Sequence, residues 1–181
     1  MKQGSYRVRW ENLTTGNIEE ARIDVERRDI FVSSDLKGED SHYVIHFDID
    51  WQLDDFEVRI NDQIVFQCQR KMNGMWVDRS SKRIMEEFKD FQYFHLTNTP
   101  MTHMMATRTL SLQPGVPNTI DVALFDVVTG KSLPVKHTYT KIDQSTLLFS
   151  DGSGDRRIML NQEEVIVEIE GQFKMIDFQI W

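Results

Sequence analysis

Alternation of apolar and polar residues with a period of two runs through most of the chain, and it restricts the fold more than any other feature. The longest run spans residues 43–51, where aromatic and aliphatic residues at the odd positions alternate with mostly polar residues between them. Side chains two positions apart on a strand share a face, so this pattern predicts strands with one face on a core and one in water. Similar runs occur at residues 6–10, 21–25, 56–60, 64–68, 120–124, 165–169 and 176–180.

Short turn sequences separate these runs. Asn73-Gly74 and Asp151-Gly152 are examples, and such dipeptides tolerate the positive φ angles that tight hairpins require. We therefore expect about a dozen or more antiparallel strands arranged as a barrel, roll or sandwich. The chain has no linker-like Pro, Gly or Ser tract, and we expect residues 1–181 to form a single domain.

Two segments depart from the alternation. In the first, the Thr99 hydroxyl can accept from amides of a helical first turn, and Pro100 fits the first helical position. Methionine and alanine follow as good helix formers, which predicts a short helix from Pro100 to Thr107. The second segment, residues 81–91, carries apolar residues at helical spacing. We interpret it as a loop with apolar anchors, with a single helical turn as the alternative.

Composition and charge exclude several classes of partner. The net charge is −8, which argues against nucleic acid and against electrostatic attachment to anionic membranes, since both require clustered Lys and Arg. Cys68 is the only cysteine, so no intrachain disulfide is possible, as is usual in a reducing compartment. The sequence contains neither a secretory signal nor an apolar run long enough to insert into a membrane, and we expect a cytoplasmic protein.

Catalytic and metal-binding patterns are weak. His42 and His46 fall on the polar face of one strand and are expected to point toward solvent, while the remaining histidines lack the close spacing of metal ligands. Cys68 alternates with glutamines on an apolar face and is expected to be a small buried residue. No nucleophile elbow or glycine-rich phosphate loop is present. We therefore predict no catalytic residue, no metal and no cofactor.

Apolar residues in and near the expected helix suggest a ligand cavity between the helix and a concave sheet. Methionine side chains adapt to irregular shapes, which suits lipid chains, but the same residues would equally fill a core. Arg108 has three open roles: binding a polar or anionic headgroup, pairing with a buried carboxylate, or pointing outward. The apolar candidates are Trp76, Phe91, Phe94, Met101, Met104, Met105, Leu110 and Tyr139.

The segment from Thr99 to Leu112, followed by Pro114-Gly115, resembles a motif of the Putative glycolipid-binding family. The sequence differs from that motif at His103, where Asn is usual, and at Met105-Ala106, which replace Leu-Pro. The resemblance covers residues 6–175 and implies a spiral β-roll, in which one long curved antiparallel sheet wraps around a single helix. It also implies a homodimer. Supporting matches are Trp10, residues 43–51, Gly74–Asp78, Val122–Phe125 and the His137-Thr138-Tyr139-Thr140 element.

Together these observations predict a non-enzymatic protein that holds a glycolipid or another amphipathic small molecule between sheet and helix. Two alternatives stay open: a dimeric scaffold with a filled core, and an enzyme acting on a lipid-linked sugar. The expected contacts to the apolar part of the ligand are Trp76, Met101, Met104, Met105 and Tyr139. Those to the polar head are Thr102, His103 and Arg108, and Thr99 is a further candidate for ligand binding.

Overall fold

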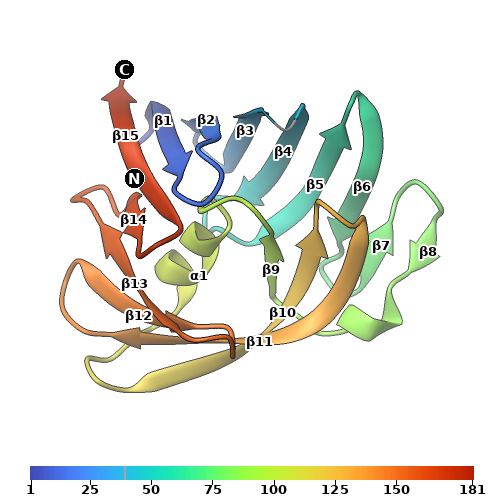
Figure 1. Cartoon of the computed structure of the whole chain (residues 1–181). Helices are drawn as coiled ribbons and strands as arrows, with labels where there is room; N and C mark the ends of the chain where they lie inside the picture. Colours follow the sequence, from blue (N-terminus) through green and yellow to red (C-terminus); the bar gives the residue numbers. More distant parts are fainter. Residues whose placement is uncertain (39) are drawn as a thin grey trace.

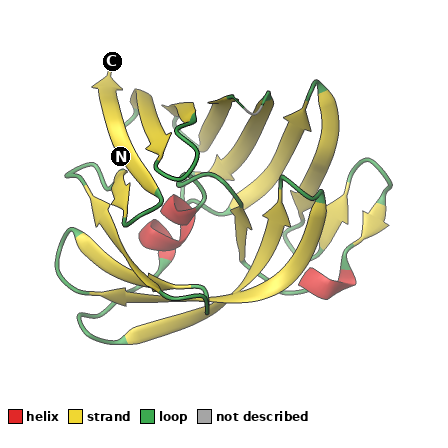
Figure 2. Ribbon diagram, in the orientation of Figure 1, coloured by secondary structure: helices red, strands yellow, loops and turns green. Residues whose placement is uncertain are grey.

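In the computed structural model, which describes residues 1–38 and 40–181, fifteen strands form one strongly curved sheet, and a single α-helix lies within its curve (Figures 1 and 2). The predicted mainly β roll around a short helix is confirmed. The strands are β1 (Gly4–Asn12), β2 (Ile18–Val25), β3 (Asp29–Lys37), β4 (Ser41–Asp48), β5 (Leu53–Ile60), β6 (Gln63–Arg70), β7 (Trp76–Asp78), β8 (Arg83–Ile84), β9 (Tyr93–Leu96), β10 (Pro117–Asp126), β11 (Lys131–Lys141), β12 (Thr146–Ser150), β13 (Asp155–Leu160), β14 (Ile166–Ile169) and β15 (Phe173–Ile180).

The two ends of the chain meet near the middle of the sheet. β1 pairs with β2 on one side and with β15 on the other, which brings both termini to the same region (Figure 1). From this centre one arm runs from β2 to β8 and the other from β14 to β9. Neighbours along each arm follow one another in sequence, as expected for strands joined by tight hairpin turns.

The pair formed by β9 and β10 differs from the antiparallel pairing predicted for the chain. These two strands are parallel, with Tyr93 opposite Val122 and Leu96 opposite Phe125. Parallel neighbours require a crossover of about a dozen or more residues, usually helical. The segment between β9 and β10 supplies that crossover and contains the helix α1 (His103–Thr109). The helix therefore sits inside the roll because the chain must return to start a parallel strand.

The helix begins three residues later than predicted and ends two residues later. Before it, the backbone amide of His103 donates to the carbonyl of Pro100, so a tighter turn precedes α1. The Thr99 hydroxyl does accept from a nearby amide, that of Met101 at 3.0 Å, although the N-cap residue is Thr102. Thr102 makes no capping bond, because its Oγ1 accepts instead from the backbone amide of Leu96.

The segment at residues 81–91 is more ordered than the expected loop. It contains the two-residue strand β8 and a 3₁₀ turn, η1 (Glu86–Phe88). Phe88 anchors this segment, since its ring is fully buried and meets the Trp76 ring edge-on at 6.1 Å between centroids. Both interpretations of the sequence are thus partly met, with apolar anchors around a single helical turn.

β9 divides the interior of the roll into two layers. Phe94 points toward an aromatic core, where its ring stacks on Phe56 at 5.0 Å between centroids. The ring of His95, the next residue, lies 4.4 Å from that of His103 on the opposite side of the strand. Cys68 is buried as predicted, and burial raises the pKa of its thiol to about 12. No helix in the described part of the chain is long and apolar enough to cross a membrane.

Candidate functional site: a pocket lined by histidines

An open pocket of about 440 Å³ lies beside the N-terminal end of α1, on the His95 side of β9. Its size falls in the range of small-molecule sites. It is lined by the turns β1–β2, β12–β13 and β14–β15, by residues of strands β9 to β12, and by the start of the helical crossover. The lining residues are Asn12, Thr14, Thr15, His95, Thr97, Asn98, Thr99, His103, Leu124, Val135, His137, Phe149, Asp151, Ser153, Gln172 and Phe173.

Three histidines form the inner part of this pocket: His95 from β9, His103 from α1 and His137 from β11. Their ring centres lie 4.4 to 6.1 Å apart. His103 and His137 are only 3% and 4% exposed, so their polar atoms are almost removed from bulk water. We refer to these three residues as the histidine cluster.

Two members of the histidine cluster are held in place through Nδ1. The Tyr139 hydroxyl lies 2.8 Å from Nδ1 of His103, and the Thr102 hydroxyl lies 2.7 Å from Nδ1 of His95. No atom of the described residues hydrogen-bonds to Nε2 of either ring, or to either nitrogen of His137. None of these nitrogens is among the fully buried polar atoms that lack a partner, so they are accessible from the open pocket. They are therefore positioned for a ligand or for water.

Burial keeps the histidine cluster uncharged. It lowers the pKa of His103 to about 3, with smaller contributions from His137 and Arg156. It also lowers the pKa of His137 to about 4. The pKa of His95 lies well below its usual value for the same reason, reinforced by its two histidine neighbours. At neutral pH each ring therefore offers one hydrogen-bond donor and one acceptor.

The rim of the pocket carries one carboxylate, Asp151, in the turn between β12 and β13. Burial raises its pKa, but hydrogen bonds from Ser153 and Arg156 outweigh this, so the pKa lies below its ordinary value and the group is ionised. Arg156 does not line the pocket; its guanidinium lies 3.1 Å from Asp151. Lys and Arg are absent from the described residues that line the pocket.

A buried polar network supports the pocket wall from behind. The Thr99 hydroxyl donates to Oε1 of Glu19 at 2.8 Å, and the hydroxyls of Ser34 and Tyr43 bond to the same carboxylate oxygen. Glu19 is 4% exposed and comes from β2, so this network joins the start of the helical crossover to the other arm of the sheet. A buried hydrogen-bonded network of this kind helps to fix the position of the wall.

The structure brings four of the nine residues predicted to bind ligand to this pocket. Thr99 and His103 line it, and Thr102 and Tyr139 hydrogen-bond to members of the histidine cluster. The others lie elsewhere. Met101, Met104 and Met105 are 0 to 1% exposed and pack in the core without lining the pocket. Trp76 lies on the Phe94 side of β9.

Arg108 lies at the other end of α1 from the pocket. Its guanidinium is 4.7 Å from the centre of the Trp51 ring, donates to the backbone carbonyl of Glu163, and pairs with the Glu164 carboxylate at 3.1 Å. Burial lowers the pKa of this group, with the two glutamates opposing the shift. These contacts tie the C-terminal end of α1 to the loop between β13 and β14. Of its predicted roles, pairing with a buried carboxylate is the nearest, but the Glu164 side chain is 61% exposed.

Several pocket residues were missed by the sequence reasoning. His137 shares a strand face with the predicted Tyr139, because the two are two positions apart, and this spacing would have found it. His95 gives no such signal, since its alternation with Phe94 and Leu96 is typical of a residue facing water. The turn residues Asp151 and Ser153 look like ordinary hairpin residues until the fold brings them to the rim.

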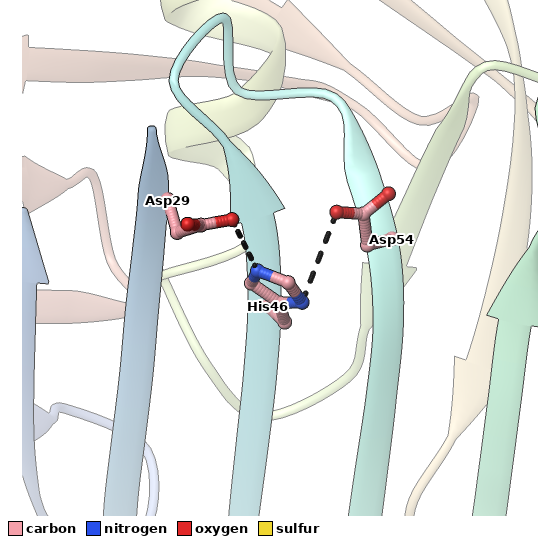
Figure 3. Close-up of side chains that lie close together, drawn as sticks. All are labelled: Asp29, His46 and Asp54. Atoms are coloured by element: carbon pink, nitrogen blue, oxygen red, sulfur yellow. Dashed lines mark hydrogen bonds and ion pairs between the residues drawn. The ribbon is translucent and has the colours of Figure 1, made fainter. Parts of the chain in front are cut away.

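A second histidine group lies on the outer face of the sheet, where Asp29, His46 and Asp54 come together (Figure 3). Within the described residues this is the one set of three potential metal ligands whose atoms lie within 4.8 Å of each other. Asp29 Oδ1 lies 3.0 Å from Nε2 of His46, and Asp54 lies 3.8 Å from Nδ1. The carboxylates thus flank opposite sides of the ring, which also stacks on Phe31 at 4.6 Å. The contacts are those of a partly exposed ion-pair group.

Comparison with known proteins agrees with this architecture. The model of the family described as Putative glycolipid-binding matches residues 7–174. The crystal structure of a DUF1089 family protein from Pseudomonas aeruginosa has a similar fold, with a TM-score of 0.66 and 17% identity over 96% of this chain and 93% of that one. No curated protein matches the chain. Because the family model spans most of the sequence, the chain belongs to the Putative glycolipid-binding family.

Proposed function

We propose that this protein binds the polar headgroup of a glycolipid, or of a similar amphipathic molecule, in the histidine-lined pocket. The observation that carries the proposal is the set of imidazole nitrogens that have no protein partner among the described residues and are accessible from the pocket. Hydroxyl and amide groups around them supply the further donors and acceptors that a sugar needs. The family description supports the same ligand class.

The apolar part of the ligand is proposed to stay outside the core. The methionines expected to contact a lipid chain are fully packed, and the lining of the pocket is mixed rather than apolar. Leu124, Val135 and Phe149 offer apolar surface within the pocket itself, enough for the non-polar face of a sugar ring. The headgroup therefore supplies recognition, and binding is non-enzymatic. A cytoplasmic location and a homodimer are parts of this proposal that rest on the single cysteine and the family resemblance.

Isothermal titration of the untagged protein tests the proposal with three classes of probe: octyl glycosides of glucose, galactose and mannose, the matching methyl glycosides, and octanoate. We expect at least one octyl glycoside to bind, its methyl counterpart to retain most of the affinity, and octanoate not to bind. Binding of octanoate as tight as that of the glycosides would contradict the proposal.

Variants at the two ends of α1 test where the headgroup binds. His103→Gln is expected to weaken glycoside binding by about tenfold or more, because it changes a group that borders the pocket. His42→Gln on the outer face is the matched control and should leave the affinity unchanged. Arg108→Met should also leave it unchanged. If Arg108→Met weakens binding as much as His103→Gln, the headgroup lies at the C-terminal end of the helix.

A further inference from the structure

The electrostatic character of the pocket deepens the proposed function, on which the following inference rests. We infer that the pocket selects an uncharged, hydroxyl-rich headgroup and rejects headgroups that carry a phosphate, sulfate or carboxylate. Three features of the pocket favour this selectivity: the uncharged histidine cluster, the ionised Asp151 on the rim, and the lack of a cation among the lining residues that the structure describes.

Neutral imidazoles match hydroxyl groups better than they match anions. The Nδ1 atoms of His95 and His103 are engaged by hydroxyls of Thr102 and Tyr139, and either atom of each pair can be the donor. The free Nε2 is consequently a donor in one tautomer and an acceptor in the other. A sugar hydroxyl both donates and accepts, so it fits either case, whereas an anion accepts only.

An anion would also enter a site without positive charge. Burial holds the pKa of His103 near 3 and that of His137 near 4, so these rings stay neutral unless the anion itself forces a proton onto them. Among the lining residues that the structure describes, Asp151 alone is ionised, and it repels an anion. The nearest opposing charge, on Arg156, is already paired with that carboxylate and with the Ser153 hydroxyl. Tyr139 stays protonated, because burial raises its pKa.

Matched probes isolate the effect of charge. Each octyl glycoside is compared with the octyl uronide of the same sugar, in which the C6 hydroxymethyl group is replaced by a carboxylate. At about pH 7.5 we expect the best-binding glycoside to exceed its uronide in affinity by about tenfold or more. Titrations in buffers of different ionisation enthalpy should show no proton uptake with the glycoside, and its affinity should stay constant down to about pH 5.5.

Asp151→Asn tests the source of the discrimination. Removing the rim charge should bring the two affinities at least about threefold closer together, mainly by strengthening uronide binding. Asp143→Asn is the matched control, because Asp143 also accepts from the amide and hydroxyl of a serine two residues later but lies outside the pocket. It should leave the ratio unchanged. Thermal midpoints of both variants report on folding.

The possible outcomes distinguish the failure of the charge selectivity from the failure of the proposed glycolipid binding. If no glycoside and no uronide binds, the proposed function fails and the selectivity fails with it. If glycosides bind but uronides bind equally well or more tightly, particularly with uptake of a proton, the proposed function stands and the selectivity is wrong. An unchanged ratio in Asp151→Asn removes that residue from the mechanism.

Discussion

The five histidines of the chain form two groups that differ in almost every physical respect. His42 and His46 lie on the outer face of the sheet, partly exposed, and each has a carboxylate oxygen within 3.0 Å of a ring nitrogen. His95, His103 and His137 lie inside the roll. No carboxylate of residues 1–38 and 40–181 pairs with them, and burial lowers the pKa of each.

This difference indicates where the fold maintains an arrangement that does not favour its own stability. A histidine beside a carboxylate at the surface is satisfied by charge and by water. An imidazole inside the roll whose nitrogens have only pocket water as a partner costs folding free energy, since its desolvation is compensated only in part. Sites of that kind mark function more reliably than the residue type does.

Acid should destabilise the protein through the histidine cluster. The pKa of each inner ring is lower in the folded state than the ordinary value of 6.5, so the unfolded chain takes up protons first as the pH falls. The contribution of these rings to the free energy of unfolding is therefore at its highest above pH 6.5, and it falls as the pH drops toward about 3 to 4. Between about pH 6.5 and 5 we expect a loss of about 1–2 kcal/mol per histidine, measured by urea unfolding.

Variants assign this acid sensitivity to one of the two groups. The double variant His103→Gln, His137→Gln should flatten the dependence of unfolding free energy on pH, whereas His42→Asn should leave its slope nearly unchanged. A wild-type stability that is constant from about pH 7 to 5 would mean that the inner rings are not desolvated as the structure indicates.

Much of the fold follows from local sequence, but the parallel pair does not. Alternation at residues 43–51 correctly predicts which side chains face the core along β4, because a strand has only two faces. The pairing of β9 with β10 depends instead on how the crossover returns the chain. No residue within either four-residue partner segment encodes that direction. The helix was recognisable from Pro100 and its methionines, although a preceding 3₁₀-like turn delays its start.

The candidate site was less predictable because it depends on depth within the roll. His95 alternates with buried residues just as a surface residue would. Its side of β9 lies inside the roll because His103 and His137 pack over it. The methionines show the converse. Their apolar character is equally compatible with a ligand surface and with a core, and the helix, whose first four residues are buried, uses Met104 and Met105 to fill the core. Sequence periodicity shows that the two faces of a strand or helix differ in polarity, but it does not show whether solvent or another layer of the protein covers each face.

Tyr139→Phe should destabilise the protein by about 1–2 kcal/mol. The variant removes the hydroxyl that lies 2.8 Å from Nδ1 of His103, leaving that buried nitrogen without a partner. Chemical denaturation near neutral pH measures the effect. Tyr6→Phe is a suitable control, since the one partner of the Tyr6 hydroxyl among the described residues is the carbonyl of Lys2, an exposed residue where water can replace the hydroxyl. Equal losses in both variants would show that the His103 contact has no special role.

His137→Leu should raise the unfolding free energy by about 1 kcal/mol and weaken glycoside binding. His137 is 4% exposed and makes no hydrogen bond with the described residues, so an apolar side chain of similar size replaces a largely desolvated imidazole that only water in the pocket can satisfy. Its ring packs edge-on against Phe149 at 5.0 Å, a contact that leucine can partly replace. A variant that is both less stable and unchanged in binding would place His137 among ordinary core residues.

Asp29→Asn should change stability least, by less than about 0.5 kcal/mol, because partly exposed ion pairs contribute little. The amide keeps the shape of the side chain while removing the charge beside Nε2 of His46. The carboxylates of Asp54 and Asp55 stay within 4 Å of the other ring nitrogen. Unfolding at about 0.05 and 0.5 M NaCl should show that salt screens even this small difference. A loss above about 1 kcal/mol would mean that the outer group is as strongly coupled to folding as the inner cluster, and position relative to the sheet would then no longer separate them.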